Sequence, residues 1–171
     1  MRVRELTRAD VPAVAELCHR CDASHRAWAG DVPVPPVAAA ELEWHTRLVR
    51  RGCWAVVALD DDGATITGAA SFAAAREGRD SGAVMPGLAH LSALFVDPPH
   101  WRRGIGRALL AAAEDAMREQ RYERARLVTL EGSPAERLYA ACGWERTHVR
   151  DVFAPMGLPT IQYVKALSRP A

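Results

Sequence analysis

Long apolar runs are missing from this sequence. No stretch approaches the ~18 consecutive apolar residues of a membrane span, and residues 1–6 lack the apolar core of a signal peptide. We therefore expect no membrane association and predict a cytoplasmic location.

An excess of one charge sign is also missing. Lys and Arg number 22 against 21 Asp and Glu, which gives a formal net charge of +1. Domains that bind nucleic acids usually carry a strong positive excess. The balance therefore argues against a nucleic-acid partner, and any recognition of phosphate must be local.

Cysteine is scarce, with four residues in the chain. Cys18 and Cys21, with His19 and His25 nearby, could form half of a metal site, but a second ligand pair at zinc-finger spacing is missing. In a reducing compartment we expect free thiols that pack as small apolar residues, and no bound metal.

A length of 171 residues fits one domain over residues 1–171, able to bury roughly 70% of its unfolded surface. Apolar periodicity predicts strands and helices in mixed order, which favours an α+β fold. A loose stretch is expected at 23–36 and a loop at 76–87. The expected elements are a strand near 3–7, helices 10–22 and 36–52, strands 53–59, 66–74 and 88–96, a helix 104–121, a strand 126–130, a helix 135–142, and strands 144–153 and 160–167.

The most informative segment runs from Leu91 to Leu110, with the sequence LSALFVDPPHWRRGIGRALL. It combines a buried strand, a proline-containing turn, a basic glycine loop and the start of a helix. Helix N-termini attract anions through free N–H groups and the helix dipole. Gly104 and Gly106 carry no side chain to keep an anion away, and Arg102, Arg103 and Arg107 can pair with phosphate oxygens. The segment predicts a phosphate-binding site.

Two common nucleotide motifs do not fit this segment. A P-loop needs Gly-x4-Gly-Lys-Ser/Thr, which is absent. A dinucleotide fingerprint needs a third glycine, but Gly104-Ile-Gly106 is followed by Arg-Ala-Leu109.

The segment resembles the cofactor motif of the GNAT superfamily of N-acetyltransferases, Gln/Arg-x-x-Gly-x-Gly/Ala between a strand and a helix. The resemblance implies an α/β three-layer fold, with a mixed, mostly antiparallel sheet flanked by helices on both faces. It also implies acetyl-CoA as co-substrate. Leu94, Phe95 and Val96 would face its pantetheine arm, and the pyrophosphate would be bound by Trp101, Arg102, Arg103, Gly104, Ile105, Gly106, Arg107 and Ala108. Trp101 stands where the family has Gln or Arg.

A second segment, Ser133 to Trp144, is similar to the family's late helix, Ala-x-x-Leu-Tyr-x-x-x-Gly-Phe/Trp. The resemblance implies that Tyr139 contacts the coenzyme A sulfur and protonates it as it leaves. Helical spacing alone would instead make Tyr139 an ordinary core residue. The asparagine common before this helix is absent, and Ser133 is a possible cofactor contact there.

An alkylamine with a pKa near ~10 must lose a proton before it attacks. The candidates for the base are His90, Glu131, His148 and Asp151, with His90 placed first. His90, Ser92 and Leu94 share one face of the sheet if no bulge intervenes. A histidine beside a strand can also be purely structural.

We therefore predict direct transfer of an acetyl group from acetyl-CoA to an amine, on a small molecule or a peptide. The alternative is a non-catalytic module that binds acyl-CoA. By analogy with the family the protein could be a homodimer. The amine cleft would draw on acidic and aromatic residues early in the chain, which could equally form a solvated helix face and core tryptophans: Asp22, His25, Trp28, Asp31, Glu41, Glu43, Trp44 and His45.

Overall fold

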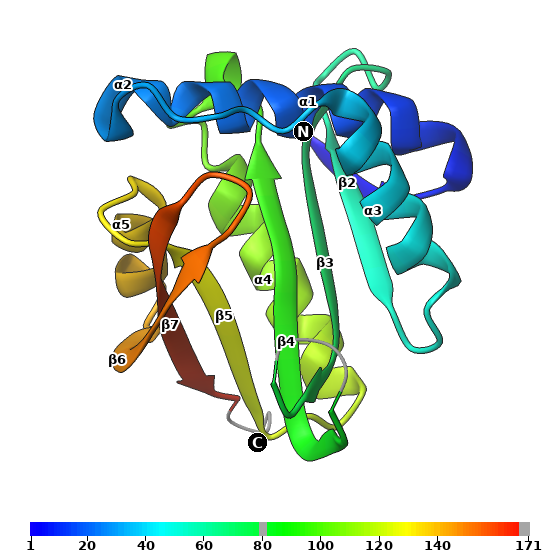
Figure 1. Cartoon of the computed structure of the whole chain (residues 1–171). Helices are drawn as coiled ribbons and strands as arrows, with labels where there is room; N and C mark the ends of the chain where they lie inside the picture. Colours follow the sequence, from blue (N-terminus) through cyan, green and yellow to red (C-terminus); the bar gives the residue numbers. More distant parts are fainter. Residues whose placement is uncertain (79–81, 168–171) are drawn as a thin grey trace.

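A seven-stranded sheet forms the centre of the computed structural model, which describes residues 1–78 and 82–167 (Figure 1). The strand order is β1-β2-β3-β4-β5-β7-β6, and all neighbouring strands pair antiparallel except β4 and β5, which are parallel. The strands are β1 (Arg2–Glu5), β2 (Trp54–Leu59), β3 (Ile66–Arg76), β4 (Val84–Val96), β5 (Arg124–Leu130), β6 (Glu145–Phe153) and β7 (Leu158–Ala166).

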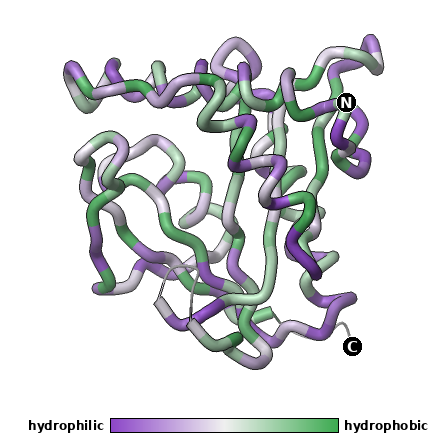
Figure 2. The backbone as a smooth tube through the Cα atoms, turned by 45° about the vertical axis from the view of Figure 1, so that its right-hand side comes forward, coloured by the Kyte–Doolittle hydropathy of each residue, from purple (hydrophilic) through white to green (hydrophobic). Residues whose placement is uncertain are grey.

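Helices cover both faces of this sheet, which confirms the predicted architecture. Hydrophilic and hydrophobic residues alternate along these helices (Figure 2), as expected for helices with one buried face. The helices are α1 (Val11–Ser24), α2 (Arg26–Ala29), α3 (Val37–Val49), α4 (Ile105–Glu119) and α5 (Ala135–Ala141), and two short 3-10 turns span Arg8–Asp10 and Pro98–His100.

Two apolar layers hold the helices to the sheet. On the front face, as seen in Figure 1, Val11, Val14 and Cys18 of α1 and Trp44 of α3 pack against β2 and β3. On the back face, α4 and α5 pack against the sheet through a larger cluster that includes Tyr139. The candidate site lies between these two layers, where two neighbouring strands of the sheet separate.

The predicted boundaries differ from the structure mainly at the β3–β4 hairpin. The loop in the structure is shorter than the predicted loop at 76–87, because β4 already begins at Val84, opposite Arg76. Residues 79–81 of this loop lie outside the described residues. Pro86 is tolerated within β4 because it lies where the pairing with β3 shifts register, between the pairs Arg76–Val84 and Ala74–Ala89. The loose stretch at 23–36 contains the short helix α2, and β5 begins two residues earlier than predicted.

A bulge in β4 overturns the prediction that His90, Ser92 and Leu94 share a face. Ser71 of β3 pairs with Ala93 and Phe72 pairs with Leu91, so Ser92 is an extra residue without a partner in the ladder. The extra residue reverses the alternation beyond it. Ser92 faces the front, where its hydroxyl lies 3.0 Å from that of Ser71, whereas Leu94 packs against the back layer.

Beyond this bulge, β4 and β5 separate. Their parallel pairing joins Leu88–Leu91 to Arg124–Leu127 and then ends, although β4 continues to Val96 and β5 to Leu130 (Figure 1). Backbone N–H and C=O groups along the two inner edges are therefore left without a ladder partner. We refer to this gap in the hydrogen bonding, between residues 92–96 and 128–130, as the β4–β5 opening.

A buried ion pair fixes the helix behind this opening. The Lys165 ammonium group lies 2.7 Å from a carboxylate oxygen of Glu114 and donates a second hydrogen bond, also 2.7 Å, to the carbonyl of Cys142 at the end of α5. The indole N–H of Trp144 donates to the same Glu114 carboxylate at 2.9 Å. α4, α5 and β7 are thus tied together, which sets the position of Tyr139.

Candidate active site

The glycine loop closes one end of the β4–β5 opening and has the form of an anion site. Arg102 and Gly104 both adopt left-handed backbone conformations, with φ of 66° and 82°. A Cβ atom on Gly104 would meet nothing within 4 Å, so the loop surface there is open. α4 begins at the next residue, and the N–H groups of its first turn have no partner within the helix. Together with exposed Arg102, Arg103 and Arg107, these features fit a bound phosphate.

Gly106 is also required for packing, which its sequence context does not reveal. A Cβ atom there would lie 3.0 Å from Cδ2 of Leu138 and 3.5 Å from Cγ2 of Val96. The absent side chain therefore allows the first turn of α4 to pack closely against α5 and the end of β4. This contact brings α5, and with it Tyr139, next to the loop.

The loop is fastened to its surroundings by side chains. The Trp101 indole N–H donates to the carbonyl of Val96 at 2.7 Å, so this residue braces the loop where the family has Gln or Arg. The buried carboxylate of Asp97 accepts hydrogen bonds from the Arg20 guanidinium at 2.9 and 3.0 Å. Arg20 belongs to α1, so the front helix and the loop are held in one arrangement.

Tyr139 lies behind the opening, only 6% exposed. Its ring is packed by Tyr163 and Trp144, with centroids 5.8 and 6.3 Å away. Its hydroxyl makes no hydrogen bond to any residue that the structure describes. Burial raises the pKa of Tyr139 above its ordinary value, so the phenol keeps its proton at neutral pH and can donate it in a hydrogen bond.

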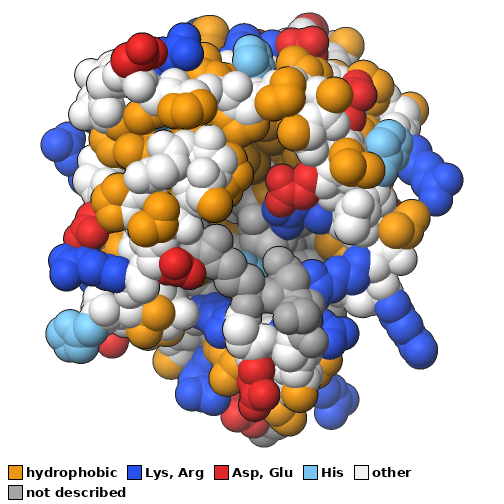
Figure 3. Space-filling view, viewed as in Figure 1, with side chains coloured by type: hydrophobic (Ala, Val, Ile, Leu, Met, Phe, Trp, Pro, Cys, Tyr) orange, Lys and Arg blue, Asp and Glu red, His pale blue; other side chains and the backbone are white. Residues whose placement is uncertain are grey.

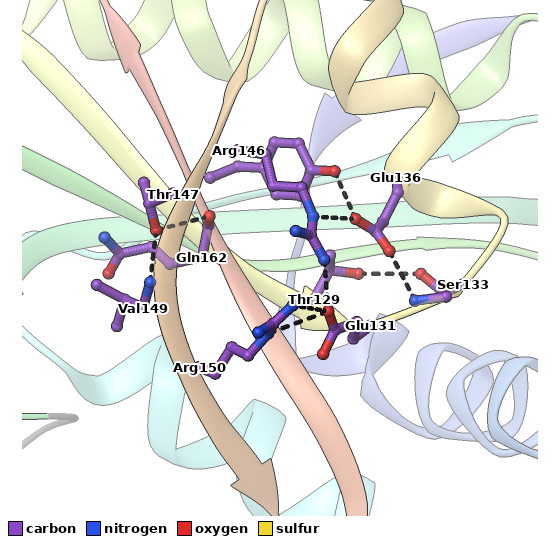
Figure 4. Close-up of polar contacts among 11 residues, drawn as sticks. Thr129, Glu131, Ser133, Glu136, Arg146, Thr147, Val149, Arg150 and Gln162 are labelled. Carbon is purple, nitrogen blue, oxygen red and sulfur yellow. Dashed lines mark hydrogen bonds and ion pairs between the residues drawn. The ribbon is translucent and has the colours of Figure 1, made fainter.

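The turn between β5 and α5 is held by a network of charged side chains (Figure 4). The Glu131 carboxylate accepts hydrogen bonds from Arg150 at 3.1 and 2.8 Å and also binds Arg146. These arginines hold the pKa of Glu131 below its ordinary value, which makes it a poor base. Ser133, the possible cofactor contact, is buried, with its hydroxyl 3.4 Å from that of Thr129.

The other candidate bases lie in different places. His90 is half-buried on the front of β4, opposite Arg126 of β5 and one residue before the pairing of the two strands ends. His148 and Asp151 are exposed on β6, and β7 separates that strand from β5. Of the four predicted bases, the structure places Glu131 and His90 next to the β4–β5 opening.

The early acidic and aromatic residues also fall into separate groups. Trp44 is a core residue that donates to the Cys18 sulfur at 3.3 Å, Glu43 binds Arg47, and the Asp31 side chain is fully exposed. Asp22 and His25 instead lie largely buried on the inner side of the α1–α2 segment, and burial raises the pKa of Asp22 to about 6. Figure 3 shows a hollow in the front face beneath this segment, bordered by hydrophobic side chains.

Arg47 forms a contact that sequence reasoning missed. Its guanidinium lies 3.4 Å from the Ser71 hydroxyl, which in turn meets Ser92 at the bulge. Arg47 lies seven residues before β2, and nothing in that position in the sequence predicts a contact with Ser71. Only the register of β3 and β4 places the two serines under α3.

All four cysteines are free, and within residues 1–78 and 82–167 no group of three or more His, Cys, Asp or Glu side chains could hold a metal. None of the described helices is long and apolar enough to span a bilayer. A cavity of about 530 Å³ lies at the β1–β2 edge, lined by residues that include Arg4, Cys53 and Gln120, away from the β4–β5 opening.

The sequence profile of the acetyltransferase (GNAT) family matches residues 17–144. The chain belongs to this family. The matched region includes the bulged strand, the glycine loop and Tyr139. A search of curated proteins finds no sequence match.

Solved GNAT structures share the fold at low sequence identity. The ribosomal-protein-S18-alanine N-acetyltransferase of Escherichia coli superposes with a TM-score of 0.73 at 17% identity, over 99% of this chain and 96% of that chain. The putative acetyltransferase yncA of Salmonella typhimurium, solved with acetyl-CoA, gives 0.72 at 20%, over 99% and 95%. PaiA N-acetyltransferase of Thermoplasma acidophilum, solved with coenzyme A, gives 0.69 at 15%, over 94% and 96%.

The environment of Asp22 predicts a stability that depends on pH. Its pKa of about 6 in the folded protein lies above the ordinary 3.8, so the folded state holds this proton more tightly than the unfolded chain. The stabilisation is complete below pH 4 and is lost as the pH rises to about 6. Asp22→Asn should therefore match the wild type near pH 4 and exceed its free energy of unfolding by about 1–2 kcal/mol above pH 6.

Urea unfolding from pH 4 to pH 8 measures this difference. Asp31→Asn removes an equal charge from a fully exposed site and should show no such pH-dependent gain. A destabilised Asp22→Asn protein at pH 8 would mean that the carboxylate supports the fold.

Proposed function

We propose that this protein transfers an acetyl group from acetyl-CoA directly to an amine, with both substrates bound at the β4–β5 opening. The observation that carries the proposal is the coincidence of three features at this opening. Unpaired strand edges line it, the glycine loop closes one end, and the Tyr139 phenol lies behind it.

The residues around the opening suit coenzyme A. The N–H groups of Gly104 to Arg107 would bind the pyrophosphate, with the arginines of the loop neutralising its charge. The pantetheine arm carries amide groups. Residues 94–96 pair with β3 but have no ladder partner on their β5 side, so Leu94, Phe95 and Val96 would offer hydrogen bonds there as in an added strand. The Val96 carbonyl already accepts from Trp101 and Cys21. Ala108 lies beside the loop on α4 and Ser133 lies across the opening, before α5.

Tyr139 would assist the departure of the thiol. Its raised pKa exceeds the ~8.5 of an ordinary thiol, so complete proton transfer to the sulfur is unfavourable. We propose instead that the phenol donates a hydrogen bond to the sulfur as negative charge develops there. Such stabilisation is strong in a site that excludes water.

His90 would accept the proton that the ammonium group of the amine must lose. It faces the front of the sheet together with Ser92, at the start of the opening. Histidine is the side chain that most often serves as a general base. The amine would thus approach from the front, while Tyr139 acts from behind.

Binding of acetyl-CoA tests the cofactor site. We expect micromolar binding by calorimetry, and Gly104→Glu should abolish it by placing a carboxylate and a strained residue at the pyrophosphate. Gly52→Glu is the matched control, since Gly52 also has a positive φ of 76° and open space, but lies between α3 and β2. Normal binding by Gly104→Glu would show that the loop does not hold the cofactor.

The role of Tyr139 predicts a turnover defect. Tyr139→Phe should lower kcat about 100-fold with little change in acetyl-CoA affinity, because one hydrogen bond to a developing charge is lost. Tyr122→Phe, at a half-buried tyrosine packed on Phe72, should leave kcat unaltered. If the two variants turn over equally, Tyr139 has no part in the chemistry.

The role of His90 predicts a change in the pH–rate profile. His90→Ala should lower kcat and flatten the fall in rate toward acid pH, because the titrating base is removed. His148→Ala removes an exposed histidine and should keep the wild-type profile. An unchanged acid limb in His90→Ala would exclude His90 as the base.

A further inference from the structure

The buried stripe of α1 changes character along the helix. Val11, Val14 and Cys18 occupy its sheet-facing side and are buried in the front core. The same helical spacing then reaches Asp22 and His25, whose side chains are only 18% and 21% exposed. A carboxylate and an imidazole therefore occupy positions where an amphipathic helix normally places apolar residues.

This change occurs where the α1–α2 segment crosses the β4–β5 opening (Figure 1). On the β4 side, the Cys21 thiol donates to the carbonyl of Val96 at 3.1 Å. On the other side, the Trp28 ring reaches the turn after β5, with Cζ3 4.0 Å from where a Cβ atom on Gly132 would stand. Asp22 and His25 lie along the segment between these two contacts, which are on opposite sides of the opening, and their side chains are largely buried.

Asp22 differs from the other buried aspartates. The carboxylate of Asp10 is held by Arg4 at 2.7 Å through both oxygens, and that of Asp97 is held by Arg20. The carboxylate of Asp22 accepts no hydrogen bond from any residue described in the structure. Nδ1 of His25 lies 4.0 Å away, is itself buried and makes no hydrogen bond within the described chain. Two other charged groups act on Asp22 from a greater distance: His19 lowers its pKa and Glu43 of α3 raises it.

A largely buried carboxylate without a partner is unfavourable in the free protein, and a bound cation would relieve this. We propose that Asp22 binds the ammonium group of the acceptor amine, with the Trp28 ring, 5.6 Å from that of His25, forming the adjoining aromatic wall. The inference rests on the proposed function, which leaves the amine unidentified, and names the chemical class of that amine. A carboxylate on the carbon that bears the amine would be repelled by Asp22. The acceptor is therefore an amine without such a group, and not a free α-amino acid.

Phenylalaninol and phenylalanine test this class, because they differ in a neutral hydroxymethyl group or a carboxylate beside the same amine. Each is titrated by calorimetry into the full-length protein saturated with coenzyme A. Wild type should bind phenylalaninol at least 10-fold more tightly than phenylalanine. Asp22→Asn should weaken phenylalaninol binding by about 10- to 100-fold, as expected for loss of a charged hydrogen bond, and remove the preference. Asp31→Asn, which removes an equal but exposed charge, should behave as wild type.

Three outcomes would overturn the inference: equal binding of the two probes by the wild type, unchanged phenylalaninol affinity in Asp22→Asn, or no binding of either probe to protein that holds coenzyme A. In each of these outcomes coenzyme A still binds, so the proposed cofactor site stands. Failure of coenzyme A itself to bind would instead reject the proposed function. The stability of Asp22→Asn at pH 8 separates loss of the amine site from misfolding.

Discussion

The separation of β4 and β5 after Leu91 is the constraint on which the rest of the site depends. Two strand edges that end their pairing inside a protein leave backbone groups that need other partners. The fold surrounds these edges with helices instead of a further strand. α4 and α5 stand behind the opening, held there by the Glu114–Lys165 pair and by the close contact at Gly106, and the α1–α2 segment crosses in front. A peptide-like ligand can then supply the missing hydrogen bonds, as pantetheine would.

Charge pairing separates the residues that support the fold from those left for a ligand. Asp10, Asp97 and Glu114 are buried acids, and each has a basic partner within hydrogen-bonding distance. Glu131 lies only eight residues before Tyr139 in the sequence, but two arginines also hold its carboxylate. It therefore fixes the turn before α5. Asp22 lacks such a partner and lies across the opening. An unpaired buried charge lowers stability, so its position there is best understood as a cost of binding a cationic substrate.

Much of this could be predicted from the sequence because the decisive signals are local. The glycine loop, the following helix and the segment from Ser133 to Trp144 are contiguous, and they identified the family and the fold. The rest depends on pairings between distant segments. The bulge at Ser92 arises from the register with β3, and it moved Leu94 to the back face. The need for glycine at 106 comes from Leu138. Asp22 follows an ordinary helical pattern, so the sequence does not distinguish it from other helix residues. Only the path of α1 over the opening marks it as a candidate binding residue.

The sheet itself separates the two proton movements of the proposed reaction. His90 and Asp22 face the front, where an amine can enter beneath the α1–α2 segment, whereas Tyr139 belongs to the back layer with α4 and α5. Because the opening passes between two strands, a thioester carbonyl carbon bound in it would be accessible from both faces of the sheet. The amine would arrive on one side of the sheet and the sulfur would depart on the other, each beside its own proton partner. Direct transfer requires the nucleophile and the leaving group to occupy the site together, and this arrangement would give each its own side.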